Sequence, residues 1–125
     1  MKELLISYRI NATAEELYRA MTDSFTLELW TGYSAKMKPE GGTEFELWGG
    51  DISGVNVEFI ENKKIVQEWH FGEQEEKSIV TITLKPKGNA TIIEVLHTNI
   101  PDEAYENIRE GWYETYLISL KSFYK

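Results

Sequence analysis

Residues 101–125 read PDEAYENIREGWYETYLISLKSFYK, and this segment carries the longest helical pattern in the chain. Pro101 followed by acidic residues is typical of a helix start, because proline fits the first turn and negative charge favours the N-terminal end of a helix. Apolar residues then recur at steps of three or four: Tyr105, Ile108, Trp112, Tyr116, Leu120 and Phe123. This spacing predicts a helix of about 20 residues with one broad aromatic face. Glu106, Glu110 and Glu114 fall on another side of it.

A helix with so broad an apolar face needs a large apolar surface to pack against. The rest of the chain provides one, because β-rich runs alternate there with turn signals. We predict strands over Leu4–Ile10, Ala35–Lys38, Thr43–Leu47, Ile52–Ile60, Ile65–Phe71, Ser78–Lys85 and Thr91–His97. Short connections such as 39–42 and 86–89 suit hairpins, so the sheet should be an antiparallel meander. The polar segment Glu73–Lys77 is expected to be a loop.

Two short helices should separate the first strand from the others. Thr13 and Glu16 have the spacing of a capping box, which predicts a helix over Ala14–Thr22. A second helix is expected over Phe25–Trp30, with Gly32 after it. The order of strand, two helices, strands and long helix predicts an α+β fold, with a curved antiparallel sheet of about six to seven strands closed over the C-terminal helix.

Length and composition limit the possible classes of protein. At 125 residues the chain is expected to form a single domain over 1–125. The formal net charge of −8 repels phosphate backbones and anionic lipids, so nucleic acid and membranes are poor partners. The chain has no cysteine, which excludes disulfides, thiolate catalysis and cysteine-ligated zinc. The N-terminal apolar run is too short for a signal peptide, so we expect a cytoplasmic protein, either a monomer or a homodimer.

No catalytic or metal-binding motif is evident. His70 and His97 have no spacing typical of metal ligands, and neither a nucleophile elbow nor a phosphate-binding loop is present. We therefore expect no metal, no cofactor and a non-enzymatic protein. His97 alternates with Ile93 and Val95, so it could face the concave side of the sheet, and the alternative is an ordinary hydrogen-bonded or surface histidine.

Alternation and glycine positions give further expectations for single residues. The alternation of Val55, Val57 and Phe59 predicts that Asn56 and Glu58 face solvent. Gly54, within a strand, indicates a bulge or bend. Gly111, within the predicted helix, suggests that the helix backbone approaches the sheet closely there, leaving Trp112 room to lie across it.

Short motifs along nearly the whole chain together resemble one known family. They are Thr13-x-x-Glu16-Leu17-Tyr18, Trp30-Thr31, Gly41-Gly42-x-x-Phe45, Gly50-Asp51-Ile52-Ser53-Gly54, Ile65-Val66-x-x-Trp69, Thr81-Ile82-Thr83-Leu84, Ile100-Pro101 and Gly111-Trp112. In this order they resemble the AHSA1 family, related to the C-terminal domain of the activator of Hsp90 ATPase. The resemblance implies the helix-grip fold, also called START-like or Bet v 1-like. The co-chaperone that gives the family its name has an additional N-terminal domain, for which this chain has no room.

The space between sheet and helix is the candidate site. We expect it to be lined by Trp30, Phe45, Trp69, His97, Tyr105, Arg109, Trp112 and Tyr116. The rings could form a hydrophobic ligand pocket, or they could simply fill a packed core. Arg109 falls within the aromatic stripe, where it could anchor a ligand carboxylate or phosphate, or snorkel to the surface.

Three functions remain open at this point. The first is a non-enzymatic domain that holds a small hydrophobic or amphipathic ligand between sheet and helix. The second, implied by the resemblance, is an interaction module for an Hsp90-type chaperone that uses its acidic surface. The third is a cyclase-like or hydrolase-like enzyme, which would gain support if His97 or Glu94 pointed into a solvent-connected cavity beside Arg109.

Overall fold

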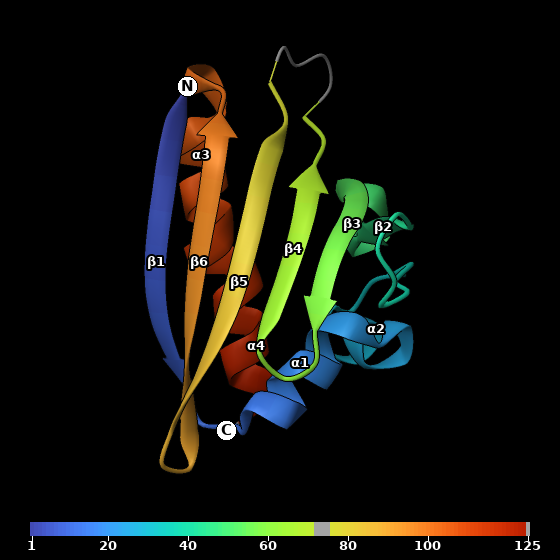
Figure 1. Ribbon diagram of the computed structural model, residues 1–125, viewed down its shortest axis with the longest axis vertical. Coiled ribbons are helices and arrows are strands. Elements are labelled where there is room, and N and C mark those ends of the chain that lie inside the picture. Colours follow the sequence, from blue (N-terminus) through green and yellow to red (C-terminus); the bar gives the residue numbers. More distant parts are fainter. Residues whose placement is uncertain (72–75, 125) are drawn as a thin grey trace.

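The protein is described from a computed structural model, which covers residues 1–71 and 76–124. Six strands form one antiparallel sheet in the order β1-β6-β5-β4-β3-β2 (Figure 1). The strands are β1 Lys2–Ile10, β2 Glu44–Leu47, β3 Ile52–Ile60, β4 Lys64–Trp69, β5 Ser78–Lys87 and β6 Ala90–Ile100. Strands β2 to β6 form the expected meander, and β1 closes the far edge by pairing with β6.

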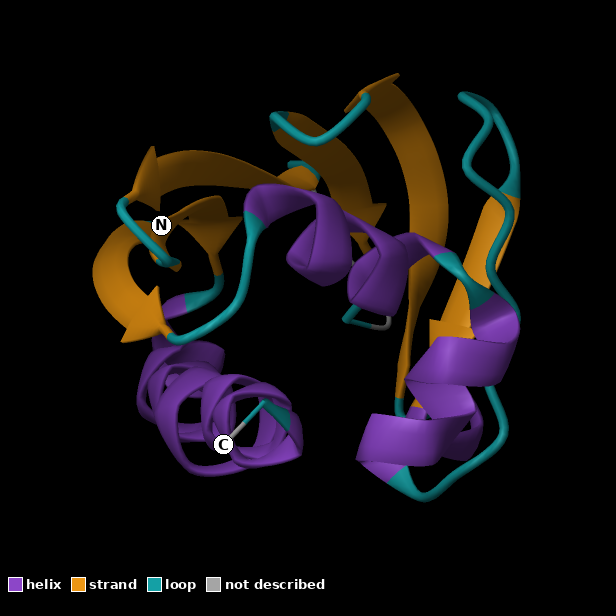
Figure 2. Cartoon of the chain, turned by 90° about the horizontal axis from the view of Figure 1, so that it is seen from below, coloured by secondary structure: helices purple, strands orange, loops and turns teal. Residues whose placement is uncertain are grey.

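The helices lie on the concave side of the sheet, whose strands arch over them (Figure 2). Helix α1, Ala14–Thr22, and helix α2, Ser24–Thr31, follow β1. The predicted capping box of α1 is confirmed, since Glu16 N–H donates to Thr13 Oγ1 over 3.1 Å and Thr13 N–H donates to Glu16 Oε1 over 3.0 Å. The α+β helix-grip architecture predicted from the sequence is therefore confirmed.

The C-terminal helix is continuous but not uniform. It comprises the 3₁₀ turn η2 Asp102–Ala104, α3 Tyr105–Gly111, the π-helical segment η3 Trp112–Leu117 and α4 Ile118–Phe123. A π-helical turn holds more residues than an α-helical one, so the buried face shifts along the helix. As a result Leu117 is fully buried, and Phe123, predicted on the buried stripe, is 41% exposed instead. No described helix is long and apolar enough to cross a membrane.

The predicted strand Ala35–Lys38 is wrong. The segment forms a single bridge, between Lys36 and Glu46, because side chains of α2 bind its backbone. Glu28 accepts a hydrogen bond from Ala35 N–H, and the Ser24 hydroxyl bonds both the N–H and the carbonyl of Met37. Of the predicted loop Glu73–Lys77, residues 73–75 lie outside the described part of the chain.

The orientation of Asn56 also differs from the prediction. Asn56 is fully buried and Val57 is exposed, because a register shift between Asn56 and Glu58 breaks the simple alternation of β3. Gly54 lies two residues earlier on the same inner face. A Cβ atom there would lie 1.8 Å from the Glu68 carbonyl oxygen, so only glycine fits at this position.

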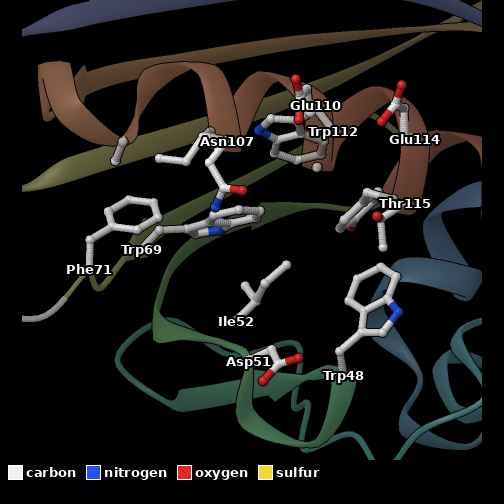
Figure 3. Close-up of a pocket in the computed structure, with 14 residues that line it drawn as sticks. Trp48, Asp51, Ile52, Trp69, Phe71, Asn107, Glu110, Trp112, Glu114 and Thr115 are labelled. Atoms are coloured by element: carbon white, nitrogen blue, oxygen red, sulfur yellow. The ribbon is translucent and has the colours of Figure 1, made fainter.

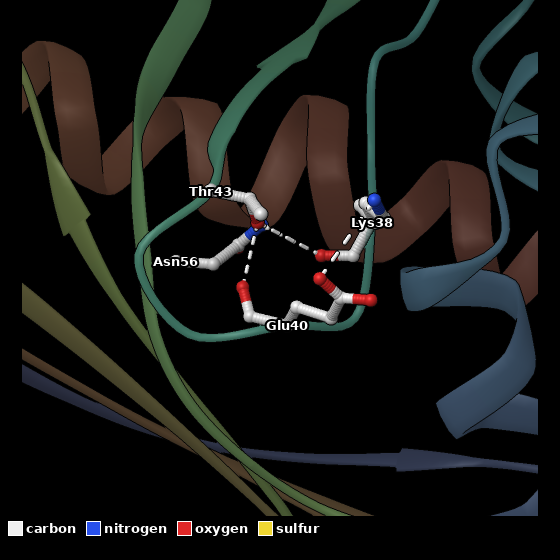
Figure 4. A network of polar contacts seen from close by, with 4 residues as sticks. All are labelled: Lys38, Glu40, Thr43 and Asn56. Carbon is white, nitrogen blue, oxygen red and sulfur yellow. Dashed lines mark hydrogen bonds and ion pairs between the residues drawn. The ribbon is translucent and has the colours of Figure 1, made fainter.

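Asn56 belongs to a buried chain of hydrogen-bonded side chains. Its Nδ2 donates to Thr43 Oγ1 over 3.1 Å and to the Lys38 carbonyl over 3.2 Å. Its Oδ1 accepts from Gln67 Nε2 over 3.1 Å, and Gln67 Oε1 accepts from Trp69 Nε1 over 3.0 Å. Figure 4 shows how this amide reaches the loop at 38–43. Both buried side-chain amides in the described part of the chain, Asn56 and Gln67, are thereby hydrogen-bonded, and the loop is tied to β3 and β4.

Candidate functional site

A half-open cleft of about 470 Å³ lies between the C-terminal helix and the sheet (Figure 3). The sheet side comes from η1, Trp48–Gly50, and from the neighbouring ends of β3 and β4. The lining residues are Trp48, Asp51, Ile52, Trp69, Phe71, Ala104, Asn107, Ile108, Glu110, Gly111, Trp112, Glu114, Thr115 and Tyr116. This volume falls within the range of small-molecule sites in proteins.

The helix side of the cleft combines large residues, such as Trp112 and Tyr116, with three small ones. Ala104, Gly111 and Thr115 lie along the lining at helical spacing. A Cβ atom added to Gly111 would meet nothing within 4 Å, so the predicted close approach of the helix backbone to the sheet is wrong. Gly111 instead preserves an opening.

All four tryptophans of the chain belong to one aromatic cluster along the cleft. Trp69 and Trp112 stack with ring centroids 4.9 Å apart and planes inclined by 17°. Trp112 contacts Tyr116 at 4.6 Å, and Tyr116 contacts Trp48 at 5.5 Å. The wall is therefore a continuous row of rings whose positions fix one another.

Trp48 reaches the cleft through an unusual backbone conformation. Its φ is +51°, and the φ angles of Gly49 and Gly50 are +66° and +102°. Positive φ is unfavourable for a bulky residue, at a cost of about 1–2 kcal/mol. The two glycines accommodate the turn, and strain of this kind is common where a side chain is positioned for binding.

His97 lies behind the cleft and is fully buried. Trp112 Nε1 donates to His97 Nδ1 over 3.1 Å, and His97 Nε2 lies 2.9 Å from Ser78 Oγ. Desolvation lowers the pKa of His97 to about 4, so the imidazole is neutral at physiological pH. His97 faces the concave side, as its alternation suggested, and it acts as a hydrogen-bonded core residue.

The predicted site residues divide into two groups. Trp69, Trp112 and Tyr116 line the cleft. The others do not: Trp30 and Phe45 are buried in the core, His97 lies behind the cleft, and Tyr105 and Arg109 lie outside it. Trp30 donates its indole hydrogen to the Ala20 carbonyl and contacts the Trp48 ring, so it supports the wall.

Arg109 is exposed and packs over the Tyr113 ring, with its guanidinium carbon 5.4 Å from the ring centroid. It therefore does not reach the cleft as a ligand anchor. Glu94 pairs with Lys85 over 3.0 Å instead of approaching His97. The arrangement required for the enzyme hypothesis, an acid or histidine in the cleft beside Arg109, is not formed by these residues.

Apart from Trp69, sequence reasoning missed the residues on the sheet side of the cleft, Trp48 and Asp51 above all. One sequence signal could have identified Trp48. A tryptophan directly before Gly49-Gly50-Asp51 lies in a predicted turn, and a turn with two glycines can hold a large side chain in a defined position. Within residues 1–71 and 76–124 no group of three or more histidine, aspartate or glutamate side chains could hold a metal ion.

Comparison with known proteins gives a consistent result. The model of a family described as "Activator of Hsp90 ATPase homolog 1-like protein" matches residues 11–125. The chain is 30% identical over 123 residues to the activator of 90 kDa heat shock protein ATPase homolog of Dictyostelium discoideum, covering 96% of this chain and 32% of that protein. It is also 30% identical over 109 residues to homolog 1 of Homo sapiens, covering 86% of this chain and 32% of that protein.

Structural comparison shows similarity over the whole fold. The crystal structure of an HSP90 activator from Plasmodium falciparum superposes with a TM-score of 0.89 at 27% identity. That match covers 98% of this chain and 96% of the other. The chain spans about a third of the length of the curated relatives it matches, and nearly all of this solved structure.

Proposed function

The chain belongs to the Activator of Hsp90 ATPase homolog 1-like family, and on that premise we propose that it is a non-enzymatic domain that binds a small amphipathic molecule in its cleft. The observation that carries this proposal is the half-open, aromatic-walled space of about 470 Å³ between the C-terminal helix and the sheet. A packed core of the same composition would fill that space.

The lining suits an amphipathic ligand. Trp48, Trp69 and Trp112 offer apolar ring surface, while Asn107 and Thr115 offer polar groups near the helix. A few polar groups within a mainly apolar lining are typical of small-molecule sites, because they orient a ligand that the apolar surface holds. We propose that these residues, with Tyr116 and Phe71, form the contact surface.

Gly111 permits a sharp test, because its φ of −59° and ψ of −41° are accessible to any residue. Binding of the neutral fluorescent probe N-phenyl-1-naphthylamine is measured for the wild type, Gly111→Ala and Gly111→Leu. We expect the alanine variant to bind like the wild type and the leucine variant to lose binding, because its side chain occupies the cleft. Arg109→Ala, which alters an exposed residue outside the cleft, is the matched surface control and should bind normally.

The proposal fails if the wild type does not bind the probe, or if Gly111→Leu binds it as tightly as the wild type does. Circular dichroism on the same samples checks that the variants are folded. Quenching of tryptophan fluorescence by the ligand gives a second readout, since three of the four tryptophans line the cleft.

A second function is favoured by the family match and by the names of the curated relatives. We propose that the domain also contacts an Hsp90-type chaperone, with its net charge of −8 directed at a basic surface. Binding to the chaperone of the same organism should be detectable by pull-down and should weaken as salt is raised. Absence of binding at low salt would contradict it, and Gly111→Leu should bind the chaperone like the wild type.

A further inference from the structure

The border of the cleft is acidic. Asp51 stands on the sheet side and Glu110 and Glu114 stand on the helix side, as Figure 3 shows. Among the described residues, no lysine, arginine or histidine lines the cleft. The three carboxylates place negative charge on both sides of the cleft, those of Glu110 and Glu114 pointing away from Asp51 in Figure 3, and no basic residue of the described lining neutralises it.

These carboxylates also have no partners elsewhere. Across residues 1–71 and 76–124, none of the three forms an ion pair or a side-chain hydrogen bond. Other acids of the molecule do pair: Glu58 with Lys64, and Glu94 with Lys85. The charge at the cleft is thus available to a bound molecule.

The apolar wall favours the same sign of charge. Aromatic rings attract cations through the negative potential of their faces, and tryptophan does so most strongly. Trp48 and Trp69 both line the cleft, one near each end of the aromatic row. An ammonium group with apolar substituents would gain from ring faces and carboxylates at once, whereas an anion would be repelled by both.

Tyr116 is an independent sign of a ligand. It lines the cleft, it is only 4% exposed, and its hydroxyl has no hydrogen-bond partner among the described residues. A tyrosine buried to this degree is ordinarily hydrogen-bonded. Burial raises the pKa of Tyr116 far above its usual range, so the hydroxyl stays neutral and can donate to or accept from a bound molecule.

We propose that the cleft selects organic cations, meaning molecules with an apolar body and a tertiary or quaternary ammonium group. This inference rests on the proposed ligand-binding function and specifies its substrate class. The apolar body lies along the row formed by Trp69, Trp112 and Tyr116, and the ammonium group lies toward Trp48 and Asp51.

The test compares three ligands of equal chain length: octyltrimethylammonium, 1-octanol and octanoate, each titrated below its micelle concentration by isothermal calorimetry. We expect the cation to bind about tenfold more tightly than the alcohol, and octanoate to bind most weakly. The variant Asp51→Asn/Glu110→Gln/Glu114→Gln should lose most of this preference, keeping only the part that the ring faces contribute. A control variant, Glu3→Gln/Glu44→Gln/Glu106→Gln, removes the same charge at exposed sites outside the cleft and should keep the preference.

The outcomes separate the two proposals. If all three ligands bind alike, or if both triple variants lose the preference equally, the cation inference is overturned and the ligand-binding function stands. If none of the ligands binds and the neutral probe does not bind either, both proposals fail. A cation affinity that decreases with salt in the wild type but not in the cleft variant supports the inference further.

Discussion

Trp112 can donate its indole hydrogen to His97 only while His97 is neutral. The bond, 3.1 Å long, ends on Nδ1, so the imidazole must carry its single proton on Nε2, facing Ser78 Oγ. Ser78 in turn donates to the Thr98 carbonyl over 3.1 Å. The neutral His97 side chain, in this one tautomer, thus links the C-terminal helix to β5 and β6. It also positions the Trp112 ring, which stacks on Trp69.

This link predicts a loss of stability in mild acid. The folded-state pKa of His97, about 4, lies below its usual value of 6.5, so its contribution is complete above pH 6.5 and is lost as the pH falls toward 4. Between pH 7 and pH 5 the wild type should lose about 2 kcal/mol more unfolding free energy than His97→Asn does. Urea denaturation at the two pH values measures the difference.

The exposed histidine supplies the control for this experiment. His70→Asn leaves His97 as the one histidine signal in an NMR titration. If the unfolding free energies of the wild type and His97→Asn changed with pH in the same way, the predicted contribution of neutral His97 to stability would be contradicted. An NMR signal from His97 that titrates near its usual pKa would contradict it independently of how stable the variant is.

Gly111→Ala should stabilise the protein. The residue has ordinary helical angles and open space around its Cβ position, so alanine gains helix propensity without a clash. We expect an increase of about 0.5–1 kcal/mol in unfolding free energy. Gly32→Ala should lower the unfolding free energy instead, because the φ of Gly32 is +80°. Destabilisation by Gly111→Ala would show that the helix does approach another element there.

At position 48, a glycine variant should be more stable than an alanine variant, which is the reverse of the usual order of stability. Both Trp48→Ala and Trp48→Gly lose the ring contacts, but only glycine relieves the positive φ, so Trp48→Gly should be more stable by about 1 kcal/mol. Thermal unfolding compares the two variants. At Leu29, which is exposed within α2, the same pair of substitutions should show the opposite order, with alanine more stable. If the alanine variant were the more stable one at both positions, the result would argue against backbone strain at Trp48.

The buried amide pair should be strongly coupled. Gln67→Leu deprives both Asn56 and Trp69 of a partner and should lower the unfolding free energy by about 2–3 kcal/mol. Asn56→Leu should have a similar effect. The double variant should be less destabilised than the sum of the two, because it leaves fewer buried polar groups unpaired. Strict additivity in urea denaturation would contradict this coupling, and Glu58→Gln, at an exposed site beyond the bulge, should be nearly neutral.

The sequence allowed most of the fold to be predicted, because local patterns dominate it. The capping box at Thr13 and the alternation of β5 and β6 fixed elements that the structure confirms. The candidate site was harder to predict from the sequence, because its geometry depends on local irregularities in a helix and a strand that residue patterns do not reveal. The π-helical segment buries both Tyr116 and Leu117, and the bulge after Asn56 turns that residue inward. Arg109, which a helical wheel placed within the aromatic stripe, is exposed, because the buried face of α3 passes through Ile108.

The pairing of β1 with β6 has a consequence for the order of events during synthesis. Lys2 pairs with Ile100, so the N-terminal strand has no native neighbour until nearly the whole sheet has been translated. Contacts this distant along the chain are slow to form, since a long loop must close before they contribute. The nascent β1 must therefore remain unpaired while the meander assembles, and its docking is the step that completes the sheet. Folding of this protein should thus be limited by a late event at its first strand.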